Sequence, residues 1–250
     1  MEPNNQTDAA VATQPVAQKS IWSIMVGIFH APTEAFAAFS KKPGILMPLI
    51  VLIIVSFIMV GLTTPYQARA QYDMMKQSTV LPQEALDRMG EDAKNPSFIK
   101  GGGFGVIFVV FASLISALVV WFVGSFFFGG TAKFTAVWGI GILAMLIPMV
   151  GGLLRLPMVI AKDSILVSYG LAAFMPGGDF TSILFSLLYY LDIFAIWSLI
   201  VAGIGYAAVF GFSRGKGIAT SAIVSLLFIM FMISLTAVGM SFAGVEISFM

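Results

Sequence analysis

The 250-residue sequence contains no cysteine and only one histidine, His30. The absence of cysteine excludes disulfide bonds, thiol nucleophiles and cysteine metal ligands, and one histidine cannot build a histidine-rich metal cluster. Charged residues make up only 10% of the chain, whereas soluble domains carry about 25%. The formal net charge is +1, so no bulk field favours a nucleic acid. We expect no metal, no cofactor and no nucleic-acid partner.

Sequence motifs that mark enzymes of nucleotide or peptide hydrolysis are also scarce. The chain has no P-loop and no His-Glu-x-x-His zinc motif, and no pair of carboxylates lies within an apolar stretch. With one histidine and no cysteine, metal-assisted hydrolysis has few residues to use. The sequence therefore predicts a protein that is not an enzyme.

What the chain has in abundance is long apolar runs. Five of them carry no charge in their interior, and each is near or above the roughly 20 residues that a helix needs to cross a bilayer. In lipid, every backbone N–H and C=O must be satisfied within the segment, so these runs must be helices. We predict an all-α polytopic integral membrane bundle of five transmembrane helices within residues 44–250, with spans at about 44–64, 103–128, 134–154, 192–212 and 218–242.

The N-terminal region differs from the rest. Residues 1–18 are polar and are expected to form a disordered tail. Residues 19–43 contain two short amphipathic segments separated by a proline, and both are too short to span a bilayer. They are predicted either to lie in the plane of the membrane or to pack on the bundle. Trp22, Phe29 and Phe36 are the candidate interface anchors.

Two longer connections join the spans. Residues 65–101 form the strongly polar loop, in which we expect two short helices, the second starting near Pro82, and a flexible glycine entry at 101–103. Residues 156–191 mix polar and apolar segments. From the sequence, these residues are expected to form one of three arrangements: interfacial, re-entrant or partly spanning.

Asp192 is the acidic residue that lies among apolar neighbours, and it forms a candidate intramembrane polar site together with Arg155 and Lys162. An intramembrane carboxylate can couple transport to protons or ions. Its place before an apolar run also suits a helix N-cap, where its oxygen would accept from first-turn N–H groups. A third interpretation is an ion pair with Arg155 or Lys162. All three stay open from the sequence.

Gly203, Ala207 and Gly211 recur at intervals of four residues. Such a small-residue stripe lets two membrane helices approach closely. It predicts a tight contact either inside the bundle or at a dimer seam.

The distribution of basic residues favours one orientation. Lys133 and the pair Arg214 and Lys216 stand in very short connections, whereas the basic residues of the other side are diluted over two long loops. Because Lys and Arg favour cytoplasmic loops, we expect the N-terminus in the cytoplasm.

Two blocks resemble a known family. The first is Pro-Thr-Glu-Ala-Phe at 32–36, followed by Lys42-Pro43 and an apolar span; the second is LDIFAIWSLIVAGIGYAAVFGFSRGKG at 191–217. Both resemble the Yip domain family of proteins that interact with Ypt/Rab GTPases. The resemblance implies five spans and a cytosolic N-terminus. The chain lacks the Asp-Leu-Tyr-Gly-Pro type motif and is similar to prokaryotic members, so Rab-type GTPase binding is not carried over.

The resemblance and the composition together imply a non-enzymatic protein of a bacterial cytoplasmic membrane. Its expected role is membrane organisation or shaping, or that of an adaptor for other membrane proteins. Its expected partners are the lipid bilayer and either other membrane proteins or further copies of itself. The alternative is a small-solute or ion permease with Asp192 as the coupling group.

Overall fold

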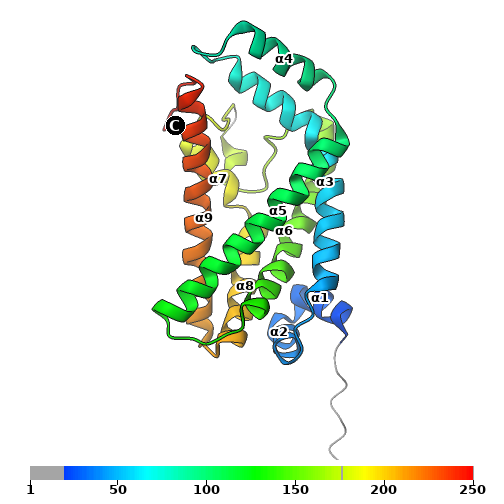
Figure 1. Cartoon of the computed structure of the whole chain (residues 1–250), viewed down its shortest axis with the longest axis vertical. Coiled ribbons are helices and arrows are strands. Elements are labelled where there is room, and N and C mark those ends of the chain that lie inside the picture. The colour runs from blue at the N-terminus through cyan, green and yellow to red at the C-terminus, as the bar shows by residue number, and fades with distance from the viewer. Residues whose placement is uncertain (1–19, 176, 250) are drawn as a thin grey trace, which may run out of the picture.

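The computed structural model describes residues 20–175 and 177–249. The predicted tail at 1–18 lies outside these residues. Five long helices run along the molecule (Figure 1): α3 Leu46–Met75, α5 Phe98–Phe122 with its π-helical continuation η1 Val123–Phe127, α6 Phe134–Lys162, α8 Ile193–Phe210 and α9 Arg214–Phe242. Each is long and apolar enough to cross a membrane. The all-α class and the five spans are confirmed.

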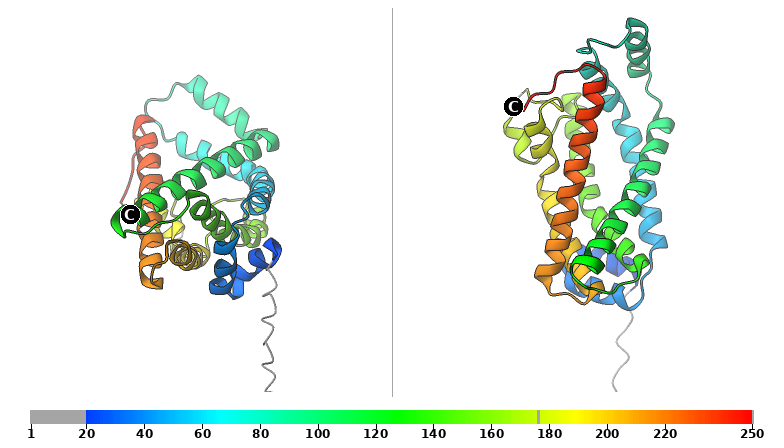
Figure 2. Two further views of the ribbon diagram at one scale, coloured as in Figure 1. Left: turned by 60° about the horizontal axis from the view of Figure 1, so that its bottom comes forward. Right: turned by 60° about the vertical axis from the view of Figure 1, so that its left-hand side comes forward.

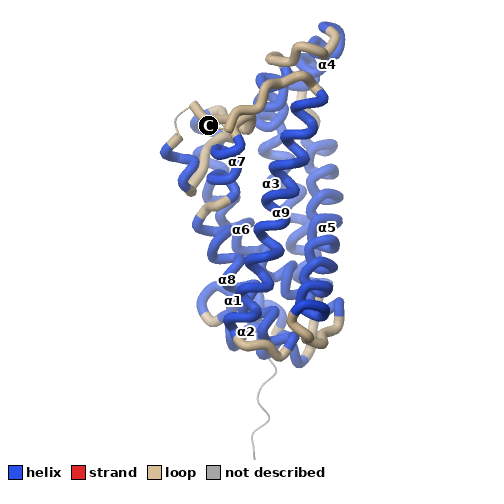
Figure 3. The backbone as a smooth tube through the Cα atoms, turned by 90° about the vertical axis from the view of Figure 1, so that its left-hand side faces the viewer, coloured by secondary structure: helices blue, strands red, loops and turns tan. Residues whose placement is uncertain are grey.

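The connections gather at the two ends of the bundle (Figure 3). One end, here called the α2 end, carries α1 (Ile21–His30), α2 (Pro32–Lys41), the loop before α6 and the turn before α9. The other, the α4 end, carries α4 (Gln83–Lys94), η2 (Leu171–Phe174), α7 (Ile183–Tyr190) and the last described residues of the chain. The short helices between α6 and α8 lie on the α4 side of the bundle, and α7, with only 8 residues, is too short to cross a bilayer by itself.

Two of the long helices extend beyond their predicted limits. α3 continues through Pro65 to Met75, so the first short helix expected in the 65–101 loop is an extension of the span. A proline removes one backbone hydrogen bond, but α3 continues as a helix beyond Pro65. α6 likewise continues through Pro157 to Lys162. Both extensions rise toward the α4 end (Figure 1), where polar side chains hold them together, as described below.

The helices α3 and α5 pack closely through glycine. Gly101, Gly102 and Gly105 lie inside or next to the first turns of α5 and face α3, and a Cβ on Gly102 would stand 2.7 Å from the carbonyl oxygen of Phe57. The expectation of a flexible glycine entry at 101–103 is therefore wrong. Glycine is needed at these positions because a larger side chain would prevent the close approach of α3.

α6 is the central helix, because 50% of its span is buried, compared with 11% for the span of α9. Its apolar face meets α8 on one side and the two N-terminal helices on another. The fully buried large side chains of this core include Ile28, Phe36, Phe39, Ile140, Leu143 and Ile147. The core therefore joins α1 and α2 to the spanning helices.

The N-terminal helix α1 buries one face and exposes the other. Ile24, Met25 and Ile28 of α1 are buried against the bundle, which is the packing arrangement foreseen as one of two alternatives. On the opposite side Trp22 and Val26 are 54% and 61% exposed. Figure 2 shows the two helices lying together against the α2 end.

The last described residues close the α4 end. Ser78, in the loop between α3 and α4, donates through its hydroxyl to the carbonyl of Ala243, and the amide of Thr79 donates to the carbonyl of Gly244 at 3.3 Å. Further on, Ser248 and Ser182 form an isolated β-bridge. The end of α9 is thus joined both to the α3–α4 loop and to the segment before α7.

Candidate functional site

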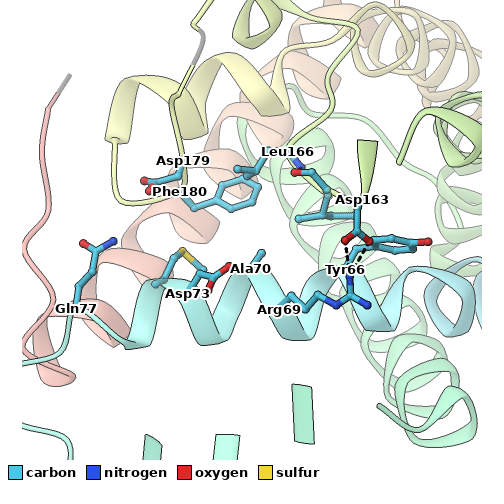
Figure 4. Close-up of a pocket in the computed structure, with 12 residues that line it drawn as sticks. Tyr66, Arg69, Ala70, Asp73, Gln77, Asp163, Leu166, Asp179 and Phe180 are labelled. Carbon is cyan, nitrogen blue, oxygen red and sulfur yellow. Dashed lines mark hydrogen bonds and ion pairs between the residues drawn. The ribbon is translucent and has the colours of Figure 1, made fainter. Parts of the chain in front are cut away.

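Polar side chains gather at the α4 end, and the clearest pairing joins α3 to α6. Arg69 on the extension of α3 donates to both carboxylate oxygens of Asp163, at 2.6 and 2.5 Å (Figure 4). Asp163 follows the last residue of α6 and has a left-handed backbone with φ 48°. Both side chains are more than half exposed, so the pair stabilises the fold by no more than about 1 kcal/mol.

A cleft of about 270 Å³ lies beside this pair, between the extension of α3 and the segment after α6. Both polar and apolar side chains line it. The lining residues are Tyr66, Arg69, Ala70, Asp73, Met74, Gln77, Asp163, Ser164, Ile165, Leu166, Asp179 and Phe180.

The carboxylates of this cleft already have partners. Asp73 pairs with Lys76 at 2.6 Å, and Asp179 accepts from the amide and the hydroxyl of Thr181 at 2.8 and 2.5 Å. Within residues 20–175 and 177–249, no group of three or more His, Cys, Asp or Glu side chains is placed to hold a metal ion. The cleft is a hydrogen-bonded surface feature with little free binding capacity.

Arg155, a member of the predicted polar site, contacts Tyr189 of α7. Its guanidinium donates to the Tyr189 hydroxyl at 2.5 Å and lies 5.3 Å from the centre of the ring. The same hydroxyl donates to the carbonyl of Ile165 at 3.2 Å. Burial raises the pKa of Tyr189, and the neighbouring Arg155 opposes this rise. Neutral Tyr189 therefore connects α6, α7 and the segment between them.

Asp192 occupies the N-cap position of α8. Its side chain accepts a hydrogen bond from the amide of Ala195 at 2.8 Å, which satisfies one of the free first-turn donors. No ion pair joins it to Arg155 or to Lys162 in the described chain. Lys162 is exposed at the end of α6. The structure thus does not bring the three predicted residues together as one salt-bridged site.

Sequence reasoning missed Arg69, Tyr189 and Asp163 as partners in these contacts. Arg69 and Asp163 are 94 residues apart, and Arg155 and Tyr189 are 34 residues apart. No local spacing links such residues. The only available signal was that both arginines stand close to the end of an apolar span, Arg155 directly after it and Arg69 five residues beyond it.

A second feature missed from the sequence is Gly211-Phe212-Ser213-Arg214-Gly215, which has the Gly-x-Ser-x-Gly spacing of a hydrolase nucleophile elbow. That motif needs a strand before the serine and a histidine beside it. Here Ser213 stands between two helices as the N-cap of α9, and its hydroxyl accepts from the amide of Lys216 at 3.4 Å. The match is a helix cap and not a nucleophile.

The small-residue stripe divides between two roles. A Cβ on Gly203 would stand 2.5 Å from the Cα of Ile218, and Ala207 lies against Gly217, so these two positions face α9 inside the bundle. Gly211 does not continue the stripe, because it ends α8 with a left-handed φ of 71°. Its need for glycine comes from this turn.

The three candidate interface anchors lie in different environments. Trp22 is 54% exposed, and Phe29 packs edge-on against Trp197 with ring centres 6.4 Å apart. Phe36 has no exposed surface and fills the core between α2, α6 and α8. The assignment of Phe36 as an anchor is wrong, because the apolar face of α2 turns inward.

Comparison with known proteins identifies one family. The model of the Yip1 domain matches residues 26–235, from α1 to the last turns of α9. No curated protein and no solved structure matches the chain. The matched region contains α2 and four of the spanning helices in full, the second half of α1, and α9 up to residue 235. The chain therefore belongs to the Yip1 domain family of multi-pass membrane proteins.

Proposed function

We propose that this Yip1 domain protein is a non-enzymatic membrane-organising protein, acting by shaping the bilayer or as an adaptor for other membrane proteins. The observation that carries the proposal is the closed, apolar interior of the bundle. In the part of the chain that the structure describes, the buried polar side chains are hydroxyls, and none is a charged group: Ser56, Thr63, Ser113, Ser182, Ser186, Thr220, Ser221 and, in the core, Tyr206.

Three of the six buried hydroxyls within the spans bond to the helices that carry them. Thr63 donates to the carbonyl of Met59 at 2.9 Å, Ser113 to that of Val110 at 2.8 Å and Thr220 to that of Lys216 at 2.9 Å. Among the described residues, no completely buried side-chain nitrogen or oxygen lacks a partner. A permease needs polar groups that can face a solute or an ion. These groups do not supply a path, which argues against the permease alternative.

The position of Asp192 argues in the same direction. It caps α8 at the α4 end and makes its hydrogen bond to the backbone. A coupling group must change its protonation or its partner during transport, whereas a cap is a fixed part of the helix. This supports the non-transport role.

The α1–α2 pair supplies the feature that a membrane-shaping protein needs. It is fixed to the α2 end by buried Ile28 and Phe36, and it leaves Trp22 and Val26 exposed on its outer side. Apolar side chains held at one end of a spanning bundle add volume to one leaflet, which favours curvature. The pair also offers an apolar surface to a partner within the membrane.

The N-terminus is proposed to lie in the cytoplasm, on the side of the membrane that the α2 end faces. The described residues of that end carry five Lys or Arg side chains and one acidic residue, Glu34. Positively charged loops remain preferentially on the cytoplasmic side. In a bacterium this membrane would be the cytoplasmic membrane, as the similarity to prokaryotic members implies.

The test is reconstitution of the full chain into liposomes, with vesicle shape recorded by electron microscopy and solute or ion flux recorded in parallel. Wild-type protein is expected to change vesicle curvature without flux. Val26→Gln should weaken the effect because it removes an outer apolar side chain at the α2 end. Val80→Gln, which has the same 61% exposure at the α4 end, is the matched control and should leave the effect unchanged.

Flux without a change of shape would establish the permease alternative. Unchanged vesicle shape with wild-type protein would remove the shaping role. The adaptor role would then rest on the recovery of a membrane partner by cross-linking from position 22 or 26.

A further inference from the structure

The two ends of the bundle treat their basic residues differently. At the α4 end, Arg69, Lys76, Arg88 and Lys94 each form an ion pair with an acidic residue, whereas Lys100, Arg155 and Lys162 form none among the described residues. At the α2 end, five exposed basic side chains form no ion pair within residues 20–175 and 177–249: Lys41, Lys42, Lys133, Arg214 and Lys216. Their charge is not neutralised by the described protein and remains available to an external anion.

Three of these positive charges do not stabilise the helices at whose N-termini they stand. Lys133 is the N-cap of α6, and Arg214 and Lys216 lie in the first turn of α9. The N-terminus of a helix carries partial positive charge, so cations there are unfavourable and anions are favourable. Two helix N-termini with added basic side chains therefore make this end attractive to a phosphate group.

These basic residues stand on adjoining segments. The ring of Phe128, in the loop that leads to Lys133, lies 6.0 Å from the ring of Phe212, which precedes Arg214. A Cβ on Gly130 would stand 2.5 Å from the same Phe212 ring, so the loop and the turn are in direct contact. Figure 2 shows this end of the bundle turned forward.

An exposed aromatic cluster lies next to this basic surface. Phe122, Phe126 and Phe127 at the end of α5 are 52%, 72% and 67% exposed, and their rings contact one another at centre distances of 5.3, 5.3 and 6.1 Å. Beside them Trp121 donates to the carbonyl of Ala132 at 3.0 Å. Trp side chains gather where hydrocarbon meets headgroups, and Trp121 is bonded to the residue that directly precedes Lys133. This arrangement suits contact between Lys133 and a lipid headgroup.

We propose that the α2 end is a binding site for anionic phospholipid. Lys133, Arg214 and Lys216 bind the phosphate of the headgroup, and the Phe122, Phe126 and Phe127 cluster contacts the acyl chains. Lys41 and Lys42 add exposed positive charge at the same end of the bundle. This inference goes beyond the proposed function, because a lipid site on this surface could serve an organiser, an adaptor or a permease equally.

Each basic residue near an anionic membrane surface contributes about 1 kcal/mol, which corresponds to about fivefold in affinity. The test uses purified full-length protein in uncharged detergent, with binding of phosphatidylglycerol and of phosphatidylcholine of identical acyl chains measured by native mass spectrometry. Wild-type protein should retain phosphatidylglycerol at least tenfold more strongly, and added salt should weaken this preference.

The triple variant Lys133→Gln, Arg214→Gln, Lys216→Gln should lose the preference. The side chains are exposed, so the fold should persist, and circular dichroism checks this. The matched control Arg88→Gln, Lys94→Gln, Lys100→Gln removes the same charge at the α4 end and should behave as the wild type.

Three results would overturn the proposal. The first is equal retention of the two lipids by the wild type. The second is an equal loss in both triple variants, which would indicate a net-charge effect and leave the basic loops with a role only in topology. The third is competition by glycerol phosphate without acyl chains at the same concentration as the lipid, which would indicate a site for a soluble anion.

Discussion

Arg155 of α6 donates a hydrogen bond to the hydroxyl of Tyr189 on α7, and that hydroxyl donates in turn to the carbonyl of Ile165. One phenol oxygen thus connects a spanning helix, a short helix and the segment between them. A hydrogen bond to a charged group contributes more than a neutral one, about 1.5–3 kcal/mol. This oxygen is one of the contacts that hold the segment between α6 and α8 in position.

Tyr189→Phe should lower the free energy of unfolding by about 1–3 kcal/mol, because it leaves both Arg155 and the Ile165 carbonyl without this partner. Thermal unfolding in detergent measures the effect. Tyr72→Phe, on the exposed extension of α3, is the control for loss of a phenol and should be nearly neutral. Equal melting temperatures for Tyr189→Phe and wild type would show that the contact adds no stability.

The same tyrosine predicts a pH dependence. Burial raises its pKa above the ordinary value of about 10, so folding favours the neutral phenol. Its contribution is complete below about pH 10 and is lost as the pH rises through the folded-state pKa. Wild-type melting temperature should therefore fall in the alkaline range, and that fall should be smaller in Tyr189→Phe. Parallel pH profiles would contradict the assignment.

Gly217→Ala should destabilise the contact between α8 and α9. Its new Cβ would meet the carbonyl of Gly203 and stand 2.7 Å from the Cβ of Ala207, and overpacking of this kind costs about 1–3 kcal/mol. Gly215→Ala, two residues earlier, meets nothing within 4 Å and should be neutral or slightly stabilising. A comparison of the two melting temperatures decides whether the stripe is a packing contact.

The cap at Asp192 predicts a graded series. Asp192→Asn should be mild, since asparagine caps helices about as well as aspartate, whereas Asp192→Ala should cost about 1 kcal/mol. Chemical or thermal unfolding measures both. If Asn is as damaging as Ala, the negative charge matters by itself and the residue is more than a cap.

The absence of cysteine allows a direct test of topology. Gly215→Cys at the α2 end and Asp92→Cys at the α4 end introduce thiols at exposed positions. An impermeant maleimide should label the first only from the cytoplasmic side and the second only from the opposite side. The reverse pattern would invert the orientation, and labelling of both from one side would contradict the five spans.

Several elements could be predicted because their cause is local. The five spans follow from uninterrupted apolar runs, and the caps at Ser20 and Asp192 follow from a polar side chain directly before such a run. The ends of α3 and α6 could not be predicted in this way. Their helices continue through Pro65 and Pro157, and the extended turns are in contact with each other: Tyr66 and Ala70 pack against the apolar cluster that contains Val159, and Arg69 pairs with Asp163.

The amino-acid sequence by itself determined that this is an all-helical, five-span membrane protein, because a backbone in hydrocarbon has no other way to satisfy its polar groups. Only the tertiary structure decided which face of each short helix is buried. It turned Phe36 into the core while leaving Trp22 outside, since the inward side of α2 depends on where α6 and α8 stand. The ion pairs between residues three or four apart follow from helical spacing. The pairing of Arg69 with Asp163, 94 residues away, was decided by the tertiary structure, because only folding of the chain brings these two residues together.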